Sequence, residues 1–385
     1  EISACLVGSE MCIRDRDNAA TAFPKASGVA EACARYLTQT GVNVARGGYA
    51  LAYEVGDIVL KTREKIAALT GVKDPRRVIF TAGATTSLNM LVKGLLRSGD
   101  KVLVSSLEHN AVMRPLRRTG ADFYRIKSSD TGIFDFNDFR ENLPGAKAVV
   151  LTHASNVCGT IQPIEAAAEE CRKTGSFVLI DAAQTAGIEK IDFDGCGFDG
   201  LAFSAHKGLM AAPGLGGLLL SERLAEILEP LIAGGTGSIS DTENIPSFLP
   251  DKFEPGTPNL CGIYALNAAL DFITTRDIKS KIAADTAFLL DGLRGLKKLR
   301  LAGLDTNEGR TGVVSVDFLG KDNADAAFFL ESEFGIMTRC GMHCAPNAHK
   351  TLGTFPQGTV RFSPGFFTTK QELETVLAAV REFLK

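Results

Sequence analysis

The chain has 385 residues, and its 42 Lys and Arg against 45 Asp and Glu give a formal net charge of −3. Hydrophobic residues make up 45% and charged residues 23% of the sequence, which is typical of a globular protein with a large core and unlike disordered, collagen-like or coiled-coil chains. The near-neutral balance gives no electrostatic signature of a nucleic-acid or membrane-surface partner. No apolar run reaches the length of about 18 residues that a membrane span needs.

The nine cysteines lie along the chain without a CxxC pair. Disulfide scaffolds belong to short secreted chains, so we expect a reduced, cytoplasmic protein in which most cysteines are small core residues. Residues 1–16 (EISACLVGSEMCIRDR) have no clear periodicity and resemble a translated sequencing adapter. We expect this leader to be artefactual or disordered, and we exclude it from the fold reasoning.

From residue 77 to residue 220, short apolar runs alternate with helical patterns. Near-continuous apolar strands indicate burial on both faces of a sheet, and strand–helix alternation indicates parallel crossovers. The sequence therefore predicts an α/β protein with a large, doubly wound, mostly parallel sheet. The expected strands are 77–81, 101–105, 122–126, 148–152, 177–181, 200–204 and 216–220, and the helices between them include 86–96, 111–119 and 164–174.

The pattern changes after about residue 265 and predicts a second, smaller α+β domain. We expect the large domain to cover residues 28–272 and the small domain to combine 17–27 with 273–385. The small domain's expected elements are a helix over 278–299, a strand over 312–318, a helix over 324–334, short strands around 336–339 and 359–362, and a final helix that begins at the capping box Thr369–Glu372 and runs to Leu384.

Two charged residues end buried strands, at the edge where ligands bind in such sheets. Lys207 follows the strand in GLAFSAHK. Burial there would lower the pKa of its amine and free it as a nucleophile, although a solvated loop lysine is the alternative. Asp181 ends FVLID, where it needs a cationic partner such as a protonated pyridine nitrogen, unless it only caps the next helix.

Further polar residues follow neighbouring strands. Gly83 permits a ligand to approach the backbone closely. Thr85 and Thr86 lie at a helix N-terminus, where they could bind a phosphate or could only cap the helix. His109 could stack on a flat cofactor or move protons, and Asn156 also comes directly after a strand. Each signal is weak alone, but together these residues predict one polar site along one edge of the sheet.

Several motifs, in this order, resemble those of class V aminotransferase-fold enzymes. They are DNAAT (17–21), GATTSLN, LEHNAV, SNVCGT, DAAQ, FSAHK, PGTPN (255–259) and RCGMHCAP. FSAHK with DAAQ is specific for the superfamily, and RCGMHCAP points to cysteine desulfurases, most closely the type II, SufS-like kind; GATTSLN also resembles the NifS branch. The resemblance covers residues 17–385 and implies a pyridoxal-phosphate enzyme of fold type I that works as a homodimer.

The resemblance implies a role for each matching residue. Lys207 would hold pyridoxal 5'-phosphate covalently, Asp181 would pair with its pyridine nitrogen, and His109 would stack on its ring and act in catalysis. Arg361 would bind the substrate carboxylate, because a guanidinium matches a carboxylate with two hydrogen bonds. The other implied cofactor contacts are Ala84, Thr85, Asn156, Gln184, Ser204, His206 and, from the second subunit, Thr257; the other implied substrate contacts are Asn156 and Ala20.

Cys344 carries the chemistry that separates desulfurases from their relatives. In the family, the equivalent cysteine takes the substrate's sulfur as a persulfide and alanine is released. It must be an accessible thiolate on a movable loop, and we expect Arg339, His343 and His349 to lower its pKa. The alternatives are a structural cysteine, a regulatory disulfide with Cys340, and a zinc site with His343 and His349, for which no fourth ligand is spaced correctly; we expect no metal.

The predicted function is a pyridoxal-phosphate-dependent cysteine desulfurase that converts L-cysteine to L-alanine. The alternatives are a selenocysteine lyase acting on L-selenocysteine, a class V aminotransferase or epimerase acting on another amino acid, and a cofactor-binding sulfur carrier without turnover. The implied partners are a second copy of the chain and a sulfur-acceptor protein, with neither nucleic acid nor membrane. The sequence leaves the pathway open among iron–sulfur cluster assembly, RNA thiolation and selenium handling.

Overall fold

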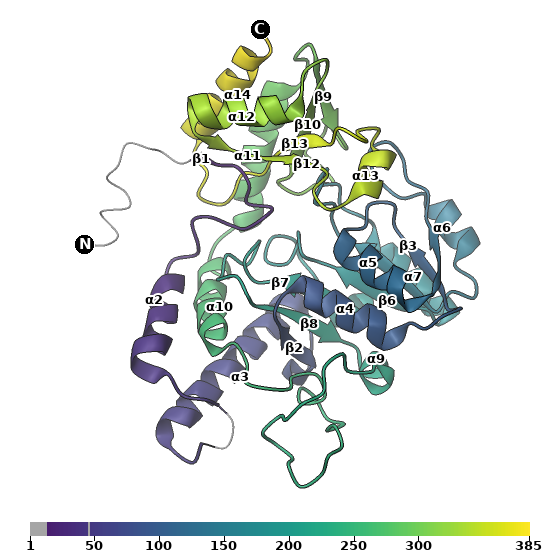
Figure 1. The fold of residues 1–385 in the computed structure, drawn as a ribbon, viewed down its shortest axis with the longest axis vertical. Helices are drawn as coiled ribbons and strands as arrows, with labels where there is room; N and C mark the ends of the chain where they lie inside the picture. The colour runs from purple at the N-terminus through teal and green to yellow at the C-terminus, as the bar shows by residue number, and fades with distance from the viewer. Residues whose placement is uncertain (1–13, 45–46) are drawn as a thin grey trace.

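A seven-stranded sheet and a four-stranded sheet organise the chain, which a computed structural model describes over residues 14–44 and 47–385 (Figure 1). The strands of the large sheet lie in the order β2–β8–β7–β6–β5–β3–β4. Neighbours from β7 to β4 run parallel, whereas β8 runs antiparallel to both β7 and β2. The strands are β2 (Val78–Thr81), β3 (Lys101–Val104), β4 (Asp122–Arg125), β5 (Ala148–Thr152), β6 (Phe177–Asp181), β7 (Gly200–Ser204) and β8 (Gly216–Leu220).

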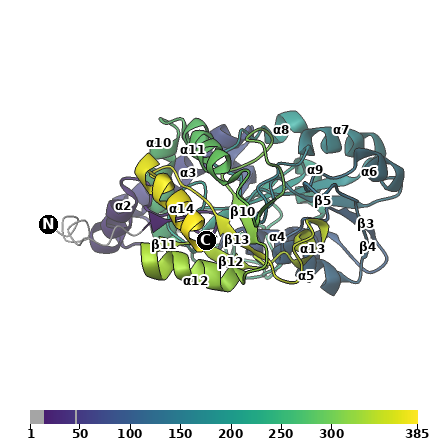
Figure 2. The same cartoon turned by 90° about the horizontal axis from the view of Figure 1, so that it is seen from above.

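Helices cover both faces of the large sheet (Figures 1 and 2). In β5, Val149 and Leu151 join one core cluster and Ala148 and Val150 join the other, because successive strand residues point to opposite faces. One face packs against α4 (Ala84–Leu95), α5 (Asn110–Thr119) and α9 (Glu222–Ile227). The other packs against α3 (Ala50–Thr70), α6 (Phe136–Asn142), α7 (Ile164–Thr174), α8 (Phe193–Cys196) and α10 (Leu260–Ile273).

The small sheet is antiparallel, in the order β12–β13–β10–β9, and a separate core forms around it. A two-stranded sheet joins β1 to β11, in parallel. The elements of this region are β1 (Arg14–Asp15), α11 (Ile278–Leu293), β9 (Leu299–Ala302), β10 (Val314–Phe318), α12 (Asn323–Phe334), β11 (Ile336–Met337), β12 (Arg339–Gly341), α13 (Pro346–Thr351), β13 (Thr359–Phe362) and α14 (Lys370–Phe383). The remaining elements are α2 (Val29–Arg35), η1 (Tyr36–Thr40) and η2 (Pro75–Arg77).

The predicted α/β class with a mostly parallel large sheet and a smaller α+β part is confirmed. Several predicted elements differ by one or two residues at their ends, and two differ more. The helix expected over 278–299 ends at Leu293, because Arg294 turns extended and Gly295 takes a left-handed φ of 77°; the end of that range begins β9. The strand expected around 336–339 is two strands, β11 and β12. The capping box of the last helix is confirmed, with both Thr369–Glu372 hydrogen bonds present.

The predicted leader is only partly described, since residues 1–13 lie outside the described residues. Arg14–Asp15 pair with β11, and Arg16 is buried and forms a 3.3 Å ion pair with Glu372. These three residues therefore belong to the fold. The predicted domain bounds stay a prediction. No helix within the described ranges is long and apolar enough to cross a membrane.

Candidate active site

The site forms at the carboxyl ends of the central strands β5, β6 and β7. Thr152, the last residue of β5, is in register with Asp181, the last residue of β6, and Ala202 of β7 is also paired with Asp181. The loop that follows Ser204 carries Lys207 before the chain returns as β8. The strand ends therefore bring together residues that lie far apart in the sequence, as the polar pattern predicted.

Lys207 is half-buried at this edge. Burial lowers the pKa of its amine; the negative charge of Asp181 opposes this, and the positive charges of Arg361 and Arg339 add to it. Its carbonyl accepts a 2.8 Å hydrogen bond from the Met210 N–H, which closes a tight turn. A larger fraction of the amine is thus neutral at a given pH than for an exposed lysine, and only the neutral amine is nucleophilic.

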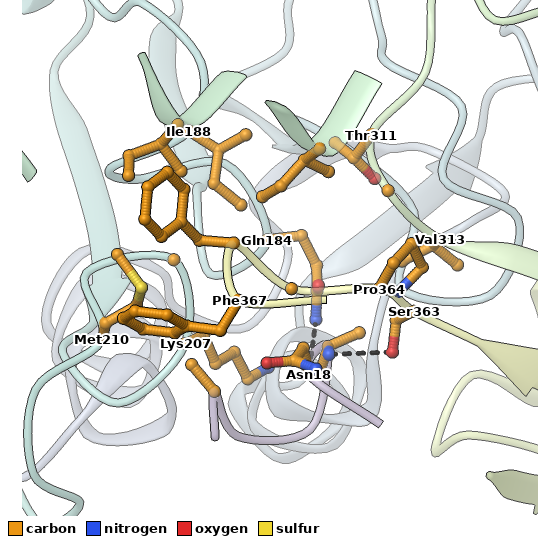
Figure 3. A pocket seen from close by; sticks show the side chains of 18 of the residues that line it. Asn18, Gln184, Ile188, Lys207, Met210, Thr311, Val313, Ser363, Pro364 and Phe367 are labelled. Atoms are coloured by element: carbon orange, nitrogen blue, oxygen red, sulfur yellow. Dashed lines mark hydrogen bonds between the residues drawn. The ribbon is translucent and has the colours of Figure 1, made fainter. Parts of the chain in front are cut away.

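A mostly apolar pocket lies beside Lys207 (Figure 3). Gln184 reaches across it, and its Nε2 donates to the Ala19 carbonyl at 3.0 Å. The Ala22 N–H donates to the His206 carbonyl at 2.9 Å. These bonds hold the 17–22 loop, which includes Ala20, against the loop of Lys207.

His109 and Asp181 are two residues that are predicted to contact the cofactor ring. Asp181 is buried, and its Oδ1 accepts from the Ala183 N–H at 2.9 Å. His109 precedes α5, and its Nδ1 accepts from the Ala111 N–H at 3.0 Å, so a neutral ring carries its proton on Nε2. Burial lowers the pKa of His109, and the charge of Lys207 adds to this, whereas Asp181 opposes it. His109 is therefore a neutral Nε2–H donor at neutral pH.

The N-terminus of α4 is where the sequence predicts that a phosphate binds. α4 begins at Ala84 after Gly83, whose φ of 146° suits glycine. Ser204 Oγ accepts from the Ala84 N–H at 3.2 Å, and Thr85 is exposed at the same end. His206 Nδ1 is buried without a hydrogen-bond partner, and burial lowers the pKa of His206 to about 4. Free helix N–H groups and an unpartnered ring nitrogen fit a phosphate.

Thr257 lies in a neighbouring hollow lined also by Thr81, Ala82 and Thr86 of the same chain. Its Oγ1 accepts from Asn43 Nδ2 at 3.5 Å. Its implied reach into the site of a second subunit stays a prediction.

Arg361 lies on β13 and is buried, with 2% of its surface exposed. Its Nη1 donates to the Asn156 carbonyl at 3.0 Å and its Nη2 to Asp17 Oδ1 at 2.5 Å, while its Nε is buried without a partner. Burial lowers the pKa of Arg361, and Asp17 opposes this. The sequence reasoning missed Asp17: the only signal was its place in DNAAT, 344 positions before Arg361.

Cys344 lies in the short connection between β12 and α13, and its side chain is exposed. Cys344 and His343 both adopt left-handed φ values, 59° and 47°. The Asn110 N–H donates to the Cys344 carbonyl at 2.8 Å, and Asn156 Nδ2 donates to the His343 carbonyl at 2.7 Å. These bonds place the thiol loop against the large sheet's active edge, next to His109. The expected mobility of the loop stays a prediction.

The prediction that positive charge on His343 and His349 lowers the pKa of the Cys344 thiol is wrong. Both rings are buried, with His343 Nε2 bonded to Thr359 at 3.1 Å and His349 Nδ1 bonded to Thr354 at 2.7 Å. Burial lowers the pKa of His343 to about 2 and that of His349 to about 4, so both are neutral at neutral pH. The guanidiniums of Arg339 and Arg361 remain as the cations near Cys344.

The described part of the chain gives no support for a zinc site or for a disulfide at Cys344. No group of three or more His, Cys, Asp or Glu side chains there could hold a metal ion. Cys340 and Cys344 are both free thiols.

The family model for aminotransferase class-V matches residues 16–376. A probable cysteine desulfurase of Vibrio cholerae is 33% identical over 380 residues (95% of this chain, 92% of that protein), and one of Pyrococcus abyssi is 31% identical over 382 residues (96% and 94%). The chain belongs to the aminotransferase class-V family.

Two solved structures are also similar. The apo cysteine desulfurase of Thermococcus onnurineus superposes with a TM-score of 0.91 at 30% identity, covering 97% of this chain and 94% of that one. The cysteine desulfurase CsdA of Escherichia coli, in its S-sulfonic acid form, gives 0.84 at 29% identity, covering 96% and 94%. The predicted family and fold are confirmed; the SufS-like subtype stays a prediction.

Proposed function

We propose that this chain is a pyridoxal-phosphate-dependent cysteine desulfurase that makes L-alanine and leaves the sulfur on Cys344. The observation that carries the proposal is the position of Cys344. It is an exposed thiol, and the Cys344 carbonyl accepts a hydrogen bond from the N–H of Asn110, the residue after His109. The position of this loop against the edge that carries the strand-end residues supports a role for Cys344 as the sulfur acceptor.

The residues at the strand ends fit the cofactor. The buried Asp181 carboxylate suits a pyridinium nitrogen, the Lys207 amine, whose pKa is lowered by burial, suits the aldehyde, and the α4 N-terminus with the unpartnered His206 Nδ1 suits the phosphate. When bound, the cofactor supplies an electron sink for charge that develops at the substrate Cα.

The chain's own residues would then orient the substrate and move protons. Arg361 and Asn156 would hold the carboxylate, which turns Cα toward Lys207. The neutral Nζ of Lys207 would take the Cα proton. His109 Nε2–H would donate a hydrogen bond or a proton beside the ring.

The transfer of the substrate sulfur to Cys344 needs no external oxidant. The Cys344 thiolate attacks the substrate Sγ, an S–S bond forms and the Cβ–Sγ bond breaks. The electron pair of that bond goes to Cβ, which takes up a proton and becomes the methyl group of alanine. The chain keeps a persulfide, which a sulfur-acceptor protein or a reductant then removes.

The test supplies L-cysteine and a reductant to the cofactor-loaded protein and measures alanine and sulfide. We expect Cys344→Ala to keep the cofactor's visible absorbance and to lose at least about a hundredfold of alanine production, as removal of a nucleophile does. The matched control is Cys340→Ala, a half-buried thiol four positions away, which should stay near wild type. Equal turnover in Cys344→Ala would refute the proposal and favour the aminotransferase or lyase alternatives, and L-selenocysteine in the same assay distinguishes the lyase.

The proposal includes a homodimer and a cytoplasmic location. Apolar side chains are exposed along the connection between α9 and α10, the extended loop at the bottom of Figure 1, at Leu231, Ile232, Ile239 and Ile245. Such a surface favours a protein partner. All seven cysteines in the described residues are free, which favours a reducing compartment.

A further inference from the structure

The ion pair between Asp17 and Arg361 lies in the carboxylate-binding part of the site. Arg361 is the residue proposed to bind the substrate carboxylate, yet its Nη2 already donates to Asp17 Oδ1 at 2.5 Å. The two residues meet because Asp17 bridges to Ser363, two positions after Arg361 on the β13 side.

We propose that Asp17 is an internal competitor for the substrate: a carboxylate ligand binds Arg361 by displacing the Asp17 side chain from Nη2. This inference rests on the proposed function for the identity of the ligand, an α-amino acid with a free carboxylate.

The hydrogen-bond donors of Arg361 explain why a ligand carboxylate would displace Asp17. Asp17 uses one donor, and the neighbouring Nε is buried without a partner. A guanidinium binds a carboxylate best through two parallel hydrogen bonds, but Asp17 contacts Arg361 through Nη2 while Nε has no partner. A free carboxylate that satisfies both donors therefore replaces a single-point contact by a two-point contact.

The surroundings of Asp17 give the displaced side chain a place to go. Its side chain is 27% exposed and borders a surface groove with Thr21, Glu331, Met337 and Thr338. Its backbone is fixed, because the Asp17 carbonyl accepts from the Ala20 N–H at 2.8 Å. A side-chain rotation into the groove releases Arg361 without moving the loop.

The competition also makes the site selective. Arg361 is buried, and an unpaired buried charge is strongly unfavourable. A ligand without a carboxylate, such as an amide, would gain no ion pair in exchange, so it leaves the pair between Asp17 and Arg361 intact. Asp17 is therefore displaced only by carboxylate ligands.

The test compares the wild type with Asp17→Asn, which keeps the shape and one acceptor oxygen but removes the charge. Dissociation constants of L-alanine and of its neutral analogue L-alaninamide are measured on the cofactor-loaded protein by calorimetry and by the change in visible absorbance. We expect Asp17→Asn to bind L-alanine at least about tenfold more tightly, since a charge-assisted hydrogen bond no longer has to be broken, and to bind alaninamide within about twofold of wild type. Glu333→Gln, which removes an exposed carboxylate outside the groove, should change neither constant.

Unchanged or weaker L-alanine binding in Asp17→Asn overturns the inference. A crystal structure of the wild type with saturating L-alanine decides the question independently, even where the variant does not fold. Asp17 turned into the groove supports displacement, and Asp17 still bonded to Arg361 beside the ligand refutes it. Failure of the proposed function and failure of this inference can be distinguished. If the protein makes no alanine from L-cysteine but Asp17→Asn binds L-alanine more tightly, the desulfurase proposal is refuted and the displacement of Asp17 is supported.

Discussion

Glu108 is a buried carboxyl group that should make the protein less stable as the pH rises. It is 1% exposed, and its Oε1 accepts from Ser105 Oγ at 2.6 Å and from the Thr152 N–H at 2.7 Å, while Oε2 is buried without a partner. Burial raises the pKa of Glu108 to about 8, the charge of Asp181 adds to this, and the two hydrogen bonds oppose it. The folded chain therefore holds this proton at pH 7.

The sign of the effect follows from proton binding. An ordinary glutamate has a pKa of 4.5, so between pH 4.5 and about 8 the unfolded chain releases a proton that the folded chain keeps. The free energy of unfolding then falls by about 1.4 kcal/mol for each pH unit across this window. Glu108→Gln cannot ionise, so its stability relative to wild type should rise by about 3 kcal/mol between pH 5.5 and 7.5.

Urea denaturation of the cofactor-saturated wild type and Glu108→Gln at pH 5.5, 6.5 and 7.5 measures this difference. Glu331→Gln, an exposed carboxylate changed in the same way, should follow the wild type at every pH. Parallel pH curves for Glu108→Gln and the wild type would show that Glu108 is ionised in the folded chain and would refute the reasoning.

Three further substitutions test separate features. Gly216→Ala would bring a Cβ to 2.6 Å from the Cα of Gly83; we expect overpacking of about 1–3 kcal/mol and weaker cofactor binding, measured by denaturation and absorbance titration. Glu254→Ala leaves the buried Arg63, now paired at 2.5 Å, without its carboxylate, and should lower the free energy of unfolding by about 3–5 kcal/mol. The pKa of His349 is lowered to about 4 from 6.5, so the unfolded chain binds the proton first and stability falls as the pH drops from 6.5 to 4. His349→Gln should remove about 3 kcal/mol of that loss, measured by urea denaturation between pH 7 and pH 4.

The sequence predicted the large sheet well because its strands are buried on both faces. The runs at 148–152, 177–181, 200–204 and 216–220 match their strands residue for residue, since a short apolar run bounded by polar residues leaves few alternatives. The prediction of a helix over 278–299 was wrong at its C-terminal end. The apolar spacing there continues into β9, and only Gly295 marks the end of the helix.

The candidate site was predictable where it depends on strand ends and unpredictable where it depends on the small sheet. Asp181, His109 and Lys207 follow strands of one sheet, so parallel topology alone places them together. Arg361 is brought there by β13, and its pairing with Asp17 depends on how the N-terminal segment lies against that strand. No periodicity in the sequence encodes such a contact.

The charges of the site constrain how a substrate can enter it. Asp17 raises the pKa of Lys207, and Arg361 lowers it. Removing Asp17 from Arg361 without replacement would leave Arg361 and the nearby Arg339 as two cations without a carboxylate partner. A substrate carboxylate that takes the place of Asp17 restores the negative charge at almost the same position. Displacement of one carboxylate by another therefore admits the substrate without leaving Arg361 as an unpaired buried charge.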